Sequence, residues 1–300
     1  MDNIFKRTSA HWVRYDKYEW KESTDGVLYL TPAKEAVMSL YNPIKEYKEL
    51  VLTALGIGLD VMQKKASMEE LKQRIQSFAQ RFGLLGLMTA LPTTPEFITY
   101  DAVYLPKNHF IKHETLSTED YLAYFFPFDG ISFRKNGQES VWNSDNREML
   151  AVIMAMQDKP QAVLMSFQKE YAESYEWITT VFSDWAFTFV TSFLYYQDYD
   201  ALEEAERNVY RKGMECFGGI APTYHIELLD KPTIVWDFHS LMLAIQMMFS
   251  FMITDENSTL KLCKHCGKIF VASRSNVQFC SPQCKNQHNV YKCRAKKDEE

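Results

Sequence analysis

The sequence predicts an α+β protein: an N-terminal domain that is mainly α with a minor β element, followed by a small C-terminal module held by cysteines. Long apolar segments at helical spacing dominate the chain from residue 147 onward. Short strand candidates lie between prolines at 92–145, and four cysteines occur as two close pairs near the C-terminus. The polar run at 255–259 predicts the boundary between a domain at 1–256 and a module at 260–300.

The expected elements follow in chain order. Val27–Leu30 is a strand candidate, and Thr31-Pro32 predicts a helix start. Ser67 and Glu70 form a capping box for a helix that ends at Gly83. Further strands are expected at 97–100, 102–105, 131–133 and 141–142. Helices are expected at 147–157, 161–175, 177–196, 200–212 and 239–253.

The composition is that of a soluble globular protein. Hydrophobic residues make up 46% of the 300 positions and charged residues 24%, which excludes an intrinsically disordered chain. The first twenty residues contain no apolar run, so no secretory signal is expected. The most apolar segment, 240–253, is shorter than the roughly 20 residues of a membrane span, so a buried helix is expected there. A cytoplasmic location with reduced thiols follows, and no membrane partner is expected.

The cysteines carry the most specific chemical signal. Five of the six lie in the last 38 residues, and four are paired as Cys263-x2-Cys266 and Cys280-x3-Cys284. Four thiolates at such spacings are typical of a structural zinc site. Iron is the alternative metal for four sulfur ligands. Because no coordination position would remain open, the metal is not expected to catalyse a reaction.

The residues around the cysteines predict the architecture of the module. Gly267 suits the left-handed backbone that follows a Cys-x2-Cys knuckle. Short apolar runs at 269–271 and 277–279 predict a hairpin with a polar turn. Ser281 as N-cap and Pro282 in the first turn predict a helix that supplies the second pair of sulfurs. A knuckle, a hairpin and a helix in this order make up a treble-clef finger.

Three nearby side chains are not expected to bind the same ion. Cys293 lies nine residues beyond Cys284, about 13.5 Å along a helix. His288 is one turn beyond Cys284 and would require rearrangement. His265 lies between two ligands and is expected to face solvent.

The module is basic, whereas the rest of the chain is acidic. Residues 261–297 contain nine Lys or Arg and no acidic residue, and residues 1–260 contain 24 basic against 36 acidic residues. On the expected helix, Lys285, Asn289, Lys292 and Lys296 fall on one face, with Arg294 beside them. Such a face suits contact with nucleic-acid phosphates. The alternatives are a solvated helix face, lysines that offset the charge of the thiolates, and a protein-binding surface.

The two motifs resemble a known family. The runs from Cys263 to Phe270 and from Phe279 to Asn286 are similar to the CGNR-type zinc finger, which ends bacterial proteins regarded as transcription regulators. The resemblance covers roughly 35 residues and implies that the four cysteines bind zinc. It also implies that the finger follows a large N-terminal domain of unknown ligand. This chain departs from the family motif by having Lys285 where the family has Gly and Gln287 where it has Arg.

The N-terminal domain shows no catalytic constellation. His109 and His113 are four residues apart but lack helical context and the glutamate of a zinc protease. The Ser-x-x-Lys pattern occurs at 132–135 and 166–169 without its partner motifs. Gly56-Ile-Gly58 lacks the third glycine of a dinucleotide loop. No enzyme is therefore expected.

The resulting expectation is a zinc-binding transcription regulator that contacts DNA or RNA through its C-terminal finger. The alternative is an interaction protein whose finger is a structural or docking module. A small ligand or a protein partner of the N-terminal domain is left open.

Overall fold

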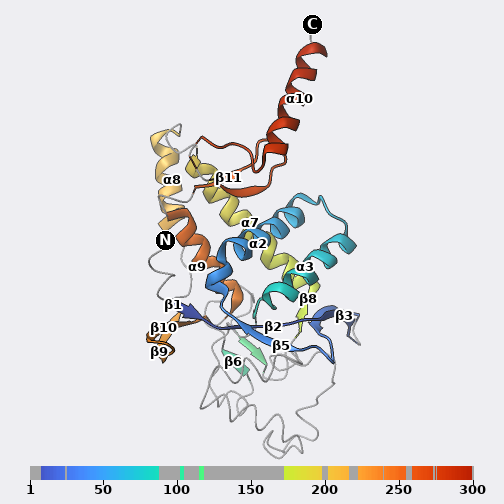
Figure 1. Cartoon of the computed structure of the whole chain (residues 1–300), viewed down its shortest axis with the longest axis vertical. Coiled ribbons are helices and arrows are strands. Elements are labelled where there is room, and N and C mark those ends of the chain that lie inside the picture. The colour runs from blue at the N-terminus through green and yellow to red at the C-terminus, as the bar shows by residue number, and fades with distance from the viewer. Residues whose placement is uncertain are drawn as a thin grey trace, which may run out of the picture.

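The structure is α+β, with helices at its centre and several small sheets around them (Figure 1). The computed structural model describes residues 8–23, 26–87, 102–104, 115–117, 172–197, 202–215, 222–238, 240–254, 259–272, 274 and 276–298. The strands expected at 97–100, 131–133 and 141–142, the helix at 147–157 and most of that at 161–175 lie outside these residues.

A central helix organises the core. This helix, α2 (Tyr47–Gln63), packs against α3 (Met68–Phe82), α7 (Tyr175–Gln197) and α9 (Leu241–Thr254). Aromatic rings fill the space between the helices: Phe78 meets Phe182 edge-on at 5.4 Å between ring centroids, and Phe189 lies 4.0 Å from Phe249. Two smaller elements complete the described helices, η1 (Pro43–Glu46) and α8 (Glu204–Glu215).

Several helix predictions are confirmed. Both hydrogen bonds of the Ser67–Glu70 capping box are present, and Gly83 ends α3 with φ of 88°. The expected helices at 177–196 and 239–253 correspond to α7 and α9 within two residues at each end. Helix α2 was not predicted, and Glu173–Ser174, expected to be helical, forms strand β8.

The strands form five small sheets in the described residues, more than the minor β element expected. Their bounds are β1 (Thr8–Ala10), β2 (Trp12–Tyr15), β3 (Tyr18–Glu22), β4 (Leu28–Pro32), β5 (Met38–Tyr41), β6 (Ala102–Tyr104), β7 (Thr115–Ser117), β8, β9 (Thr223–Leu228), β10 (Pro232–Asp237), β11 (Thr259–Leu262) and β12 (Ile269–Ala272). The strand orders are β1-β10-β9, β2-β5, β3-β4-β8, β6-β7 and β11-β12. The expected helix start at Thr31-Pro32 is wrong, because Pro32 pairs with Tyr18 at the end of β4.

Strands β2 and β5 are bound to the C-terminal end of α3. The indole N–H of Trp12 donates to the carbonyl of Leu84 at 3.2 Å, and the Tyr41 hydroxyl donates to the carbonyl of Phe82 at 2.8 Å. These carbonyls lie at or just beyond the end of the helix, where such groups lack an intrahelical partner. The strands therefore satisfy groups that α3 leaves unpaired.

The segment after α3 wraps around a buried carboxylate. The backbone N–H groups of Leu85, Gly86 and Leu87 donate to Glu173 of β8 at 3.0, 2.7 and 3.1 Å. Glu173 is 1% exposed and lies opposite Leu30 of β4. One side chain thus joins the end of α3 to the β3-β4-β8 sheet.

Two glycines of α2 provide a matched stability test. A Cβ atom at Gly58 would lie 2.3 Å from the carbonyl oxygen of Phe182, so Gly58→Ala should push α7 away and destabilise the protein by about 1–3 kcal/mol. A Cβ atom at Gly56 would meet only the end of the Arg74 side chain at 3.5 Å. Gly56→Ala should therefore stabilise the helix by roughly 0.5–1 kcal/mol. Urea unfolding checks both changes, and similar effects at the two positions would contradict this packing.

Among the described residues, no helix combines the length and apolar character that crossing a membrane requires.

Candidate metal centre

The first cysteine pair lies in the turn of a hairpin. Strands β11 and β12 pair antiparallel, with Leu262 opposite Ile269, and the knuckle connects them. Within the knuckle, the N–H of Gly267 donates to the carbonyl of Cys263 at 2.9 Å, and Gly267 has φ of 69°, as the sequence predicts. The predicted hairpin is wrong in one strand: β12 pairs with the residues before the knuckle, and 277–279 form no strand.

The second cysteine pair lies at the start of a helix, as predicted. Helix α10 (Pro282–Asp298) begins directly after Ser281, whose hydroxyl accepts a hydrogen bond from the N–H of Cys284 at 3.2 Å. Ser281 is therefore the N-cap, and Pro282 occupies the first helical position. The cap places Cys284 in the first turn, where the helix dipole favours a thiolate.

The four sulfurs converge. The Sγ atoms of Cys263, Cys266, Cys280 and Cys284 lie within 4.8 Å of one another. The distance between Cys266 and Cys280 is 3.7 Å, and that between Cys280 and Cys284 is 3.5 Å. A tetrahedral ion with metal–sulfur bonds of about 2.3 Å requires sulfurs about 3.8 Å apart. The four cysteines could therefore hold a metal ion.

The protein environment favours charge on one sulfur of the cluster and opposes it on another. Burial raises the pKa of Cys263, but the backbone N–H groups of Cys266, Cys280 and His265 outweigh it and lower the pKa from 9.0 to about 6. Burial and the adjacent thiols, that of Cys284 foremost, raise the pKa of Cys280 to about 12. A bound cation would replace protons in this cluster, because thiolates rather than thiols are metal ligands.

Aromatic side chains pack beside the sulfurs. The rings of His265 and Tyr291 stack at 5.8 Å between centroids, and His288 lies 5.1 Å from Phe279. The expectation that His265 faces solvent is wrong, since this half-buried ring contacts α10. These contacts join the knuckle to the helix beyond the ligands themselves.

The hairpin also packs on the rest of the protein. Strand β11 contacts α9 and β12 contacts α2. Leu260 is 2% exposed and belongs to the main hydrophobic core, against which Leu262, Ile269 and Val271 also pack. The candidate metal centre is therefore anchored on the helices of the body. The division of the chain into a domain at 1–256 and a module at 260–300 stays a prediction.

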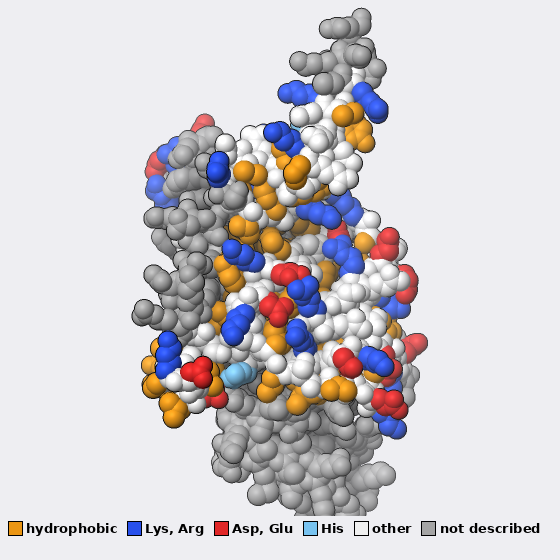
Figure 2. Space-filling model, viewed as in Figure 1, with side chains coloured by type: hydrophobic (Ala, Val, Ile, Leu, Met, Phe, Trp, Pro, Cys, Tyr) orange, Lys and Arg blue, Asp and Glu red, His pale blue; other side chains and the backbone are white. Residues whose placement is uncertain are grey.

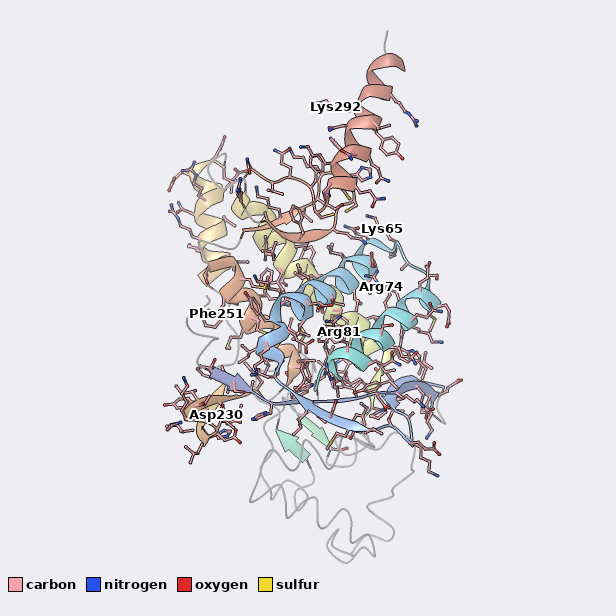
Figure 3. The ribbon with its side chains drawn as sticks, in the orientation of Figure 1. Lys65, Arg74, Arg81, Asp230, Phe251 and Lys292 are labelled. Atoms are coloured by element: carbon pink, nitrogen blue, oxygen red, sulfur yellow. The ribbon has the colours of Figure 1, made fainter. Side chains whose placement is uncertain are left out.

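The predicted contact residues lie on α10, which projects away from the body (Figure 1). The side chains of Lys285, Asn289, Lys292 and Arg294 are exposed, and that of Lys296 lies outside the described set. Figure 2 shows Lys and Arg side chains gathered where α10 leaves the body, and Figure 3 places Lys292 farther along the helix. Within the described part of the chain, none of these cations forms an ion pair.

The sequence prediction left three exposed cations out of the contact set. They lie around the knuckle and in the loop before α10: Lys264, Lys268 and Arg274. The sequence feature that could have identified them is the absence of acidic residues from the whole module, and not only from the basic face of the helix.

Comparisons with protein-family models, with curated proteins and with solved structures gave no match.

Proposed function

We propose that the C-terminal module is a treble-clef zinc finger that binds nucleic acid through its phosphates. Four converging sulfurs support a structural metal, and zinc is the ion that prefers four thiolates in a tetrahedron. The resemblance of the two cysteine motifs to CGNR-type fingers supports a role in transcription regulation.

The observation that carries the proposal is the positive charge on α10, whose described cations form no ion pair with the described residues. Lys285, Lys292 and Arg294 are exposed on a helix that projects from the body, and the module has no acidic residue before Asp298. Cations already paired with carboxylates would have less to gain from a phosphate. Cations free of such partners release the counterions of nucleic acid on binding, so the affinity depends on salt.

Fluorescence anisotropy of the zinc-loaded full chain with a labelled DNA duplex or RNA tests the proposal. The logarithm of the binding constant should fall linearly with the logarithm of salt concentration, with a slope near −0.9 for each phosphate contact on duplex DNA. The variant Lys285→Gln/Lys292→Gln should make the slope shallower by about two, because two cations are lost. Binding that is unaffected by salt would overturn the proposal.

A matched control separates this effect from net charge. Lys17 and Lys34 are exposed lysines in loops of the body, after β2 and β4. The variant Lys17→Gln/Lys34→Gln removes the same charge and should leave the salt dependence unchanged. Equal loss in the two double variants would mean that overall charge, and not α10, determines binding.

A second candidate function has its own observation. Val290 and Tyr291 of α10 are 49% and 61% exposed, although both are large hydrophobic side chains. Such residues suit a protein partner, for which the finger would be a docking module. In that case nucleic-acid binding would be weak, and Val290→Ser would reduce capture of the protein partner while Lys285→Gln would not.

A further inference from the structure

The β9–β10 hairpin exposes apolar side chains on one face. Tyr224, Ile226 and Leu228 alternate along β9 and are 63%, 69% and 79% exposed. Ile234, which pairs with Ile226 on β10, is 41% exposed. Figure 2 shows hydrophobic side chains gathered at the lower left, where Figure 1 places this hairpin, and Figure 3 marks its turn at Asp230. An apolar face of this kind is unusual for a strand surrounded by solvent.

The hydrogen-bonding pattern of the hairpin leaves the outer edge of β9 open. Leu228 pairs with Pro232, which has no N–H, so this must be a non-hydrogen-bonded pair. Pairs alternate along an antiparallel ladder, so Ile226–Ile234 and Tyr224–Trp236 are also non-hydrogen-bonded. The N–H and C=O groups of Tyr224, Ile226 and Leu228 therefore point away from β10. Within the described residues, β9 is an edge strand.

The edge of β9 is complementary to itself. In an antiparallel pair of two β9 strands related by a two-fold axis at Ile226, Tyr224 lies opposite Leu228 of the second copy. The three residues with outward backbone groups then form the hydrogen-bonded pairs, as the ladder requires. An aromatic residue opposite an aliphatic one is a favourable cross-strand pair. Register, side-chain packing and backbone polarity thus agree.

The other face of β9 is also complementary in charge. In the same register His225 lies opposite Glu227 of the second copy, and this pair occurs twice. Within one chain His225 already contacts Asp237 at 2.9 Å, and Glu227 contacts His11 at 3.1 Å. Acidic and imidazole groups would therefore alternate across the junction, and no like charges would face each other.

We propose that two copies of this chain associate through antiparallel pairing of their β9 strands, with Ile226 at the two-fold axis. The association joins two three-stranded sheets into one of six strands and places the exposed apolar side chains of the two β9 strands side by side. It extends beyond the proposed function, because it involves neither the metal centre nor α10. A few side chains and one strand edge bury less surface than the roughly 800 Å² per partner of a standard interface. A dissociation constant on the order of micromolar is therefore expected.

Sedimentation equilibrium at protomer concentrations from about 1 to 100 μM tests the proposal. The mean mass of the native chain should rise from 35.1 kDa toward twice that value. Ile226→Lys places two like charges opposite each other at the axis and should weaken association more than tenfold. Val209→Lys on α8 is the control, because Val209 is 73% exposed on another element and its replacement should leave association unchanged.

Charge complementation tests the register. Tyr224→Lys and Leu228→Glu should each weaken association, whereas the two changes in one chain place opposite charges across the junction and should restore it. A native chain of constant 35.1 kDa mass, or an Ile226→Lys variant that associates like the native chain, would overturn the proposal. A double variant no better than either single one would overturn the register. Circular dichroism verifies that each variant is folded.

Discussion

Removal of the metal is expected to unfold α10 and the knuckle while the helices of the body stay folded. A zinc ion held by the four sulfurs would supply most of the free energy that holds so small a unit together, since structural zinc sites bind with about 10–16 kcal/mol near neutral pH. Helix α10 is joined to the knuckle by Cys284 and by the ring contacts of His288 and Tyr291, whereas most of its described side chains are exposed. The hairpin β11–β12 should remain partly anchored, because Leu260 lies in the main core.

Circular dichroism with a chelator measures this loss. The helical signal should fall by the share that α10 contributes. The body should still show a cooperative melting transition, at a lower temperature than in the metal-loaded protein. Cys280→Ser should reproduce the change without chelator, because it removes one of the four sulfurs. Cys293→Ser is the control: this cysteine lies outside the cluster in the sequence and its replacement should preserve metal content. An unchanged α10 in the metal-free protein would contradict the account.

Replacement of Glu173 by Ala is expected to be the most damaging single substitution in the body. Three backbone N–H groups, of Leu85, Gly86 and Leu87, would lose their carboxylate acceptor in a buried setting. Each unsatisfied buried polar group costs about 1–3 kcal/mol, and removal of the buried carboxylate itself offsets part of the loss. We therefore expect the free energy of unfolding to fall by about 3–5 kcal/mol for the three donors together.

Two further variants show that the effect belongs to the carboxylate. Glu173→Gln retains one carbonyl acceptor, so it should cost less than Glu173→Ala. Glu176→Ala removes an exposed carboxylate of α7 three residues away and should change stability by less than about 0.5 kcal/mol. Urea unfolding compares the three proteins. Equal stability of Glu173→Ala and the native chain would show that the loop after α3 does not depend on this residue.

Local sequence signals predicted the helices whose ends carry recognisable capping residues. The capping box at Ser67 and Glu70 predicted α3, and Ser281 with Pro282 predicted the start of α10. The spacing of the four cysteines predicted the cluster, because paired ligands on one knuckle and one helix turn are local features. Such signals depend on a few neighbouring residues, so sequence alone is sufficient for them.

The central helix had no such signal. Helix α2 is surrounded by α3, α7 and α9, so its apolar residues are not confined to one face and show little periodicity. It also contains Gly56 and Gly58, which are unfavourable in an isolated helix. Close packing of Gly58 on α7 explains the second glycine, and that contact between distant segments is invisible in the local sequence.

The strands at 27–30, 102–105 and 269–271 were predicted and correspond to β4, β6 and β12, but others, β9 among them, were missed for a related reason. Residues 224–228 alternate apolar and polar side chains, which is a strand signal, but the apolar side faces outward and not toward the core. In the metal module, 277–279 resembled a strand, yet the N–H of Val277 donates to the carbonyl of Arg274 in a turn and Gln278 accepts from Lys264 of the knuckle. Which segments pair is determined by tertiary contacts that periodicity does not encode.

The metal content of the native full chain, measured together with X-ray absorption at the metal edge, tests the four-sulfur site directly. One zinc per chain with four sulfur neighbours at about 2.3 Å is expected. A chain purified under reducing conditions with no bound transition metal, or a metal with nitrogen and oxygen neighbours in place of the four sulfurs, would contradict this expectation.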